Sequence, residues 1–164
     1  MNNEYNSRSE AYDIVQSFVD TLELKQIDYD KMSWCWKWVT ELTRGTFMWV
    51  EFRIIFYDVG HPCAYIKVSD TDLMLRDIIK TEWYNGIPCQ TCHWWFTFWQ
   101  FTKEDDTRWF GEWLWIGWDY GHYWDYADYL KDLPSFEEMR KRTTEDILVE
   151  VVEQILALKK GGYL

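Results

Sequence analysis

Cationic side chains are scarce in this chain. It carries 17 Lys and Arg against 28 Asp and Glu, which gives a formal net charge of -11 at pH 7. Binding to a nucleic acid backbone rests on Lys and Arg, so the composition argues against direct contact with phosphates. The acidity fits two other roles. The more common one is solubility of an aromatic-rich protein, and the second is mimicry of nucleic acid toward a basic protein groove.

Long apolar segments are also missing. The first residues, MNNEYNSRSE, are polar, whereas a secretory signal peptide needs an apolar core. No run approaches the about 18 apolar residues of a membrane-spanning helix. We therefore expect no signal peptide and no contact with a membrane. The four cysteines are expected to lie in a reducing compartment, either free or bound to metal.

Sequence signatures of cofactor sites are weak. The chain has no Gly-rich phosphate loop and no G-x-S-x-G elbow. The segment CQTCH, at 89–93, has the form of a haem attachment site, but that chemistry requires export. Its two cysteines could hold zinc only with further ligands, for which His61, Cys63 and His93 are candidates. We expect free cysteines beside a strand and no cofactor.

Aromatic residues, by contrast, make up 20% of the chain, with 13 Trp. Trp and Tyr bury large areas, yet their N–H and O–H groups need partners. We expect a single domain, residues 1–164, whose core holds most of these rings. The remaining rings would form a stacking surface for a ligand or another protein.

Hydrophobic periodicity predicts an α+β domain, in which an antiparallel sheet of about four strands carries N- and C-terminal helices packed on it. Residues 1–7 are expected to be a disordered tail, followed by an amphipathic helix over 9–24. The closing helix is predicted over 143–159, with Thr143 as its N-terminal cap and Gly161 at its end.

The strands are predicted from β-branched and aromatic runs. Residues 46–57 give the clearest strand and form a hairpin with 63–68. Two further strands are expected at 92–101 and 109–118, joined by a charged turn. Residues 32–43 fit both a strand and a helix, because their tryptophans alternate at period two while a helical stripe also exists. We favour a helix there.

The stretch WLWIGWDYGHYWDYADY combines the most apolar surface with the most groups capable of chemistry. After its apolar run turns at a glycine, Asp119, His122 and Asp125 follow at steps of three. If the two predicted hairpins share one sheet, their strand ends would bring these residues near His61 and His93. Such a cluster could bind metal or transfer protons. The simpler alternative, in which each histidine caps a turn or bonds a neighbouring carboxylate, is favoured.

Strand alternation divides the tryptophans of this stretch between two faces. Trp113 and Trp115 share one face and are expected to be packed. Trp118 lies on the opposite face and, with Tyr123 and Trp124, is expected to form a binding surface. The predicted ligand-binding set is Asp119, His122, Asp125, Trp118, Trp124, His93 and Trp95. No catalytic residue is assigned.

Two alternative sites remain open. A mimic of nucleic acid would present carboxylates to a protein partner, and the candidates are Glu104, Asp105, Asp106, Asp128 and Asp132. A metal-dependent hydrolase would use His61, His122, Asp119 and Asp125.

Three stretches resemble a widespread family of small, largely uncharacterised proteins of bacteriophages and prophages. They are FRIIFYDVGHPCAYIKV at 52–68, WLWIGWDYGHYWD at 113–125 and RTTEDILVEVVEQILAL at 142–158. The middle stretch is similar to the family's motif Gly-aromatic-Asp-x-small-His-x-x-Asp. The matching positions are Gly117, Asp119, His122 and Asp125.

The chain departs from this family at two places. Trp124 stands where the family usually has Gly. The family also has a histidine followed by two glycines at the start of a strand, and here His93 is followed by Trp94 and Trp95.

The resemblance implies a phage-encoded accessory protein that counteracts host defence in the cytoplasm of the infected bacterium. The first hypothesis is non-enzymatic sequestration of a small nucleotide-type ligand by stacked tryptophans, with Arg53, Lys67 or Arg108 at its phosphates. The second is an acidic mimic of nucleic acid that inhibits a host defence nuclease or another protein. The third is a metal-dependent hydrolase. We leave open whether the chain forms a homo-oligomer.

Overall fold

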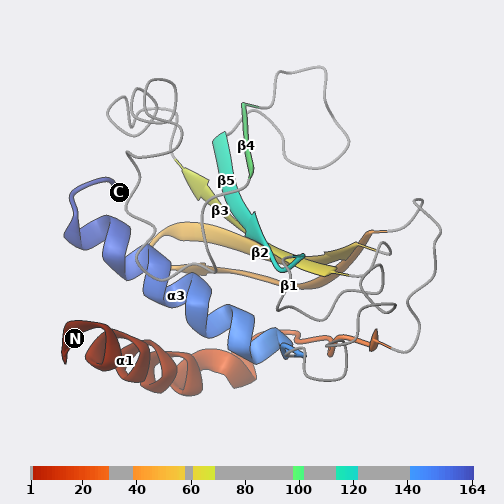
Figure 1. The fold of residues 1–164 in the computed structure, drawn as a ribbon, viewed down its shortest axis with the longest axis horizontal. Coiled ribbons are helices and arrows are strands. Elements are labelled where there is room, and N and C mark those ends of the chain that lie inside the picture. Colours follow the sequence, from red (N-terminus) through yellow and green to blue (C-terminus); the bar gives the residue numbers. More distant parts are fainter. Residues whose placement is uncertain (1, 30–38, 58–60, 69–97, 102–113, 122–140) are drawn as a thin grey trace, which may run out of the picture.

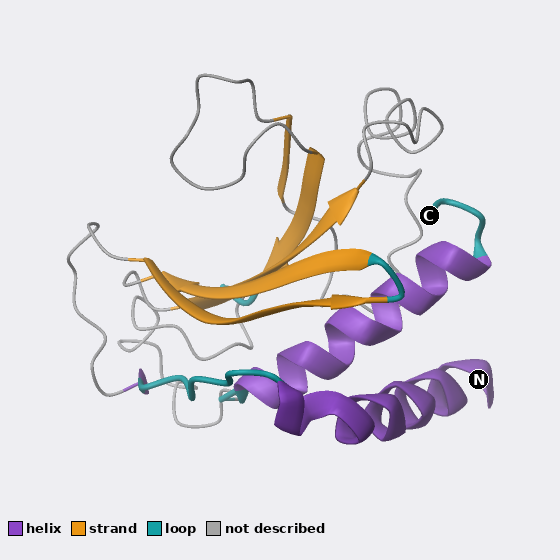
Figure 2. Cartoon of the chain, turned by 180° about the vertical axis from the view of Figure 1, so that it is seen from behind, coloured by secondary structure: helices purple, strands orange, loops and turns teal. Residues whose placement is uncertain are grey.

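A computed structural model describes residues 2–29, 39–57, 61–68, 98–101, 114–121 and 141–164. Within these ranges, two long helices lie against one side of a twisted sheet (Figures 1 and 2). The elements are α1 (Asn2–Phe18), the short 3-10 helix η1 (Val19–Thr21), β1 (Val39–Phe47), β2 (Val50–Tyr57), β3 (His61–Val68), β4 (Phe98–Phe101), β5 (Leu114–Asp119) and α3 (Thr144–Lys160).

The described strands form one antiparallel sheet in the order β1-β2-β3-β5-β4. The predicted fold class is confirmed, with five described strands where about four were expected. β3 is the central strand and pairs with β2 on one side and β5 on the other. The two predicted hairpins therefore lie in a single sheet.

The prediction of one strand over 46–57 is wrong, because a two-residue turn divides it. β1 ends at Phe47, Met48 and Trp49 form the turn, and β2 begins at Val50. Two-residue hairpin turns usually have the sequence Asn-Gly or Asp-Gly, which makes them recognisable. Here both turn residues are large and apolar, so the hydrophobic pattern continues through the turn and hides it.

The favoured helix over 32–43 is wrong for its described part, since residues 39–43 belong to β1. Pairing with β2 overrides the helical stripe. Gly45 is an interior residue of β1. A Cβ there would lie 2.8 Å from the ring of Phe52, so the glycine allows the packing of that ring.

Both terminal helices are present. The N-terminal one differs from the prediction at both ends, because α1 ends at Phe18 and the 3-10 helix η1 ends at Thr21, where a helix to residue 24 was expected. α1 begins at Asn2, not at Ser9, so residues 2–7 are helical and not a disordered tail. In α3, the hydroxyl of Thr143 accepts from the Asp146 N–H, and the Asp146 carboxylate accepts from the Thr143 N–H. This reciprocal capping box confirms the predicted cap.

The C-terminal end of α3 closes with two backbone bonds. The N–H of Gly162 donates to the carbonyl of Lys159, and the N–H of Tyr163 donates to Leu158. These are the bonds of a Schellman motif. It places Gly162, with φ of 74°, in the left-handed region that glycine adopts most easily.

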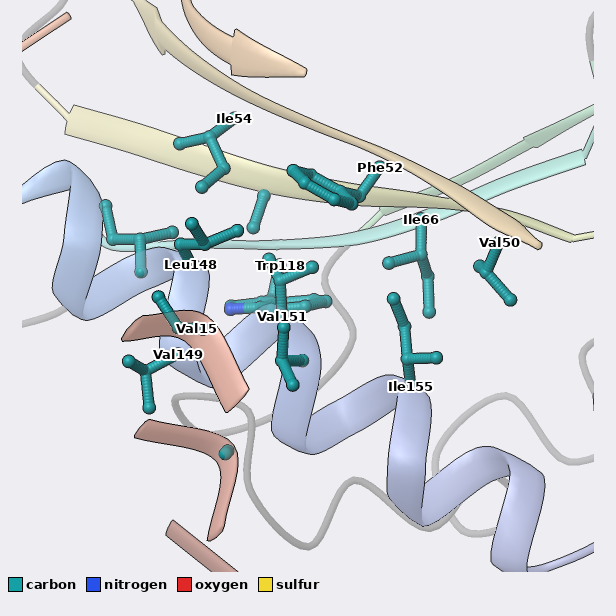
Figure 3. Close-up of a cluster of buried hydrophobic side chains, with 14 of the residues drawn as sticks. Val15, Val50, Phe52, Ile54, Ile66, Trp118, Leu148, Val149, Val151 and Ile155 are labelled. Atoms are coloured by element: carbon teal, nitrogen blue, oxygen red, sulfur yellow. The ribbon is translucent and has the colours of Figure 1, made fainter. Parts of the chain in front are cut away.

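The main core fills the space between the sheet and the two helices. Figure 3 shows side chains of β2 and β3 meeting those of α3, with Trp118 of β5 in the same layer. A second buried cluster lies on the opposite face of the sheet and consists of Ile55, Cys63, Tyr65 and Trp115. Both faces of the sheet therefore carry buried side chains.

Candidate functional site

The pairing of β3 with β5 decides where the predicted His/Asp cluster lies. Cys63 is the Cα partner of Asp119, and the N–H of Tyr120 donates to the carbonyl of Pro62 at 3.1 Å. His61, the first residue of β3, therefore lies at the same end of the sheet as Asp119. The predicted convergence of strand ends is confirmed for these two residues. The other members, His93, His122 and Asp125, lie outside the described residues.

Asp119 has a structural role at this end of the sheet. Its Oδ1 accepts a hydrogen bond from the N–H of Gly121 at 3.0 Å, which is the bond of an Asx turn. The carboxylate thereby fixes the direction in which the chain leaves β5.

Gly117, the first residue of the stretch that resembles the phage family's motif, is required by close packing. It lies inside β5 opposite Tyr65. The prediction that the chain turns at this glycine is therefore wrong. A Cβ at this position would lie 2.5 Å from the Tyr65 ring and 2.6 Å from the carbonyl oxygen of Ala64. Because backbone cannot move aside as a flexible side chain can, only glycine fits well here.

Cys63, the Cα partner of Asp119 in the sheet, is buried and is not part of a disulfide. Burial raises the pKa of its thiol far above the ordinary value, and the nearby Asp119 carboxylate raises it further. The thiol therefore stays protonated, whereas zinc binding and nucleophilic attack need the thiolate. Within the described ranges, no group of three or more His, Cys, Asp or Glu side chains could hold a metal ion. The cysteines at 89 and 92 lie outside those ranges.

The prediction that Trp118 belongs to a binding surface is wrong. Its side chain is 1% exposed, and its indole N–H donates to the Tyr120 hydroxyl at 2.9 Å. The predicted opposition of Trp115 and Trp118 is correct, because they belong to the clusters on the two faces. Alternation gives the side on which a ring lies but not what covers that side. Trp95, Trp113, Tyr123 and Trp124 lie outside the described residues.

A buried polar network links this stretch to α3. The Tyr120 hydroxyl donates to Glu150 Oε2 at 2.7 Å, and Arg142 forms an ion pair with the other oxygen of the same carboxylate. The Arg142 guanidinium also lies 5.3 Å from the centre of the Tyr120 ring. Burial and the neighbouring Glu150 raise the pKa of Tyr120 well above its ordinary value, so its hydroxyl remains a donor.

Sequence reasoning missed Glu150, which is 2% exposed by side chain. It lies three residues after Ile147 and between two buried valines of α3. That position on the apolar stripe is the signal that could have found it. A buried carboxylate needs a cation and hydrogen bonds, and here Arg142, Arg8 and Tyr120 supply them.

Two cations proposed for phosphate binding are already engaged. The guanidinium of Arg53 lies 5.2 Å from the centre of the Trp115 ring. The ammonium of Lys67 contacts Glu51 at 3.0 Å. The third candidate, Arg108, lies outside the described part of the chain.

The described part of the chain presents carboxylates along the outer side of the N-terminal helix. Glu10 and Asp13 of α1 and Asp20 of η1 are exposed, and the spacing of three residues places Glu10 and Asp13 on one side of α1. Among the described residues, no cation is paired with them. A shallow hollow lined by Ser9, Glu10, Asp13, Ile14 and Ser17 follows the same side. We call Glu10, Asp13 and Asp20 the acidic side of the N-terminal helix.

The sequence already contained the signal for this acidic side, because the buried stripe of the helix leaves these positions opposite. The acidic residues that we had predicted to bind a partner, Glu104, Asp105, Asp106, Asp128 and Asp132, lie outside the described residues.

No described helix is both long enough and apolar enough to cross a membrane. Comparison of the chain with protein-family models, with curated proteins and with solved structures finds no match. The similarity to phage proteins therefore stays a prediction that rests on three stretches of sequence.

Proposed function

We propose that this protein acts by binding a basic surface of another protein, as a mimic of nucleic acid. The observation that carries the proposal is the acidic side of the N-terminal helix, whose three carboxylates are exposed and lack a described cationic partner. The net charge of -11 supports it, because a field of one sign steers a partner of the opposite sign into contact.

The spacing of these carboxylates suits a groove built for phosphates. A helix rises 1.5 Å per residue, so Glu10 and Asp13 are separated by about 4.5 Å along the axis. Successive phosphates of one DNA strand are separated by about 3.4 Å along the duplex axis. A row of Lys and Arg that neutralises phosphates could therefore meet two carboxylates of the helix.

A host defence nuclease is the partner class that the phage resemblance favours, since such enzymes bind phosphates through basic grooves. Sequestration of a nucleotide is the weaker candidate. Trp118 is buried, and Arg53 and Lys67 have partners within the fold. A nucleotide would thus have to be held by other residues.

Charge reversal tests the proposal. We expect Glu10→Lys combined with Asp13→Lys to lower the affinity for the co-purifying bacterial protein at least tenfold. Glu23→Lys combined with Glu41→Lys serves as the control, because it changes the net charge equally at one exposed and one partly exposed carboxylate, each with a described cationic partner. Affinity is measured by titration calorimetry between about 50 and 200 mM salt, a range over which phosphate-like contacts weaken strongly.

Two results would contradict the proposal. One is an equal loss of affinity in the control variant, which would mean that overall charge alone matters. The other is a rise in melting temperature with nucleotides such as ATP or cyclic dinucleotides, because a ligand of the folded state stabilises it.

A further inference from the structure

The turn between β1 and β2 exposes two large apolar side chains. Trp49 is 97% exposed and Met48 is 47% exposed, while Trp115 and Trp118 of the same sheet are buried. Figure 2 shows this turn at one end of the long β1–β2 ribbon. An indole that is almost fully exposed contributes almost no buried apolar area to the fold. Packing within the chain therefore does not explain its position.

The backbone of the turn is costly for these residues. Met48 and Trp49 have φ angles of 48° and 70°, as a two-residue hairpin turn of the primed type requires. Glycine and asparagine adopt this region readily, whereas bulky side chains rarely do. Asn-Gly would make the same turn with less strain. Strain retained where a simpler sequence would serve is characteristic of functional positions.

The base of the turn is firmly held. The ring of Phe47 stacks on that of Phe18 of α1, with centroids 5.9 Å apart. Val50 is buried on the other side of the turn, in the layer that Figure 3 shows facing α3. The two exposed side chains therefore project from a fixed support, which lowers the conformational entropy lost when they bind.

We propose that Met48 and Trp49 form an apolar anchor that inserts into an apolar pocket of a protein partner, beside the basic surface described above. This inference rests on the proposed function, because it assigns a second contact to the same partner. Trp is the residue most enriched among interface positions that dominate affinity. The charge of the chain sets the chemistry of the pocket's surroundings, which should be basic.

Two other occupants fit less well. A membrane surface carries anionic lipids that attract basic segments, whereas this chain has a net charge of -11. A second copy would need a pocket for the indole. The hollow between α1 and α3, lined by residues such as Arg8 and Glu145, measures about 110 Å³, which is below the roughly 150 Å³ of a cavity that holds benzene. The larger hollow beside Glu10 and Asp13 is shallow and lined mostly by polar side chains.

The test compares Trp49→Ala with Tyr12→Ala, which removes the other largely exposed aromatic ring of the described residues. The probe is the purified protein that co-purifies with the wild type, titrated at two salt concentrations. We expect Trp49→Ala to lower the affinity at least tenfold without changing its salt dependence. We expect Tyr12→Ala to lower it less than twofold. Labelling with 5-fluorotryptophan should show one fluorine resonance shifting on binding, the one that Trp49→Phe removes.

A second variant is measured first for stability alone and then for binding to the same protein. Met48→Asn combined with Trp49→Gly installs the preferred turn pair and should raise the melting temperature while abolishing the contact. A lower melting temperature would mean that these side chains support folding, and it would overturn the inference.

The remaining outcomes separate the two proposals. If Trp49→Ala binds like the wild type while Glu10→Lys with Asp13→Lys does not, the anchor is wrong and the acidic mimic stands. If wild type forms no stoichiometric complex with any protein, both are wrong. Trp49-dependent sedimentation with phosphatidylcholine vesicles, or Trp49-dependent dimers in analytical ultracentrifugation, would replace the protein pocket by a membrane or a second copy.

Discussion

Two tryptophans of the same sheet lie at opposite extremes of exposure. Trp118 in β5 is 1% exposed and donates its N–H to Tyr120, while Trp49 beside β2 is 97% exposed. One is enclosed by helices and fixed by a polar network. The other stands on a strained turn at the end of a hairpin. Tryptophan in this chain therefore fills the core at one position and is exposed to solvent at another.

The largest expected effect comes from removing the buried ring. Trp118→Ala should lower the free energy of unfolding by about 3–5 kcal/mol, because it leaves a cavity and takes a donor from Tyr120. Trp49→Ala should change it by less than about 0.5 kcal/mol. Equilibrium unfolding in urea measures both. Similar losses in the two variants would show that the contrast in exposure has no counterpart in stability.

Stability should also fall when the polar network that connects Trp118 and Tyr120 with Glu150 loses a single charge. Glu150→Gln should lower the free energy of unfolding by about 3 kcal/mol, because the buried Arg142 guanidinium then loses the charge of the carboxylate that it pairs with. The control is Arg8→Ala. Its side chain is 44% exposed and lies 3.5 Å from the same carboxylate, so we expect a loss below about 1 kcal/mol. Thermal unfolding of the three proteins would contradict this order if Arg8→Ala proved the more damaging change.

A further effect should appear in alkaline solution. Cys63 and Tyr120 both have pKa values raised by burial in the folded protein, so the folded state holds these protons more tightly than the unfolded chain. Their contribution is complete below the ordinary thiol value of 9.0 and is lost as the pH rises past 9.0 and then 10.0. Each group can account for up to about 1.4 kcal/mol per pH unit.

The measurement is the free energy of unfolding between about pH 8 and pH 11, the region of these ordinary pKa values. Cys63→Ala should flatten the decline that begins near the thiol value, and Tyr120→Phe should flatten the later decline. Identical slopes in wild type and both variants would mean that other groups cause the alkaline loss.

Local sequence signals predicted the parts of the fold that local chemistry determines. The box of Thr143 and Asp146 marks the start of α3, and the β-branched run of β2 marks its strand. β1 was missed because the alternating tryptophans before it also fit a helix, and pairing with β2 decided between the two. The turn at Met48 and Trp49 was missed because it lacks the residues that such turns prefer.

The sequence predicted less of the candidate site than of the fold. The placement of His61 and Asp119 at the same end of the sheet followed from the idea that both hairpins share a sheet. The burial of Trp118 did not follow, because strand alternation cannot say which face the helices cover. Glu150 and Trp49 were missed for the same reason, since the burial of the one and the exposure of the other depend on packing between distant segments.

The position of Glu150 near the C-terminal end of the chain also bears on biosynthesis. The strands that precede it are made first, and the Tyr120 hydroxyl cannot donate to Glu150 until α3 has left the ribosome. During that interval the face of the sheet that carries Trp118 is uncovered. Chaperone demand should therefore be highest for nascent chains that end before residue 144 and should fall once the last helix can dock.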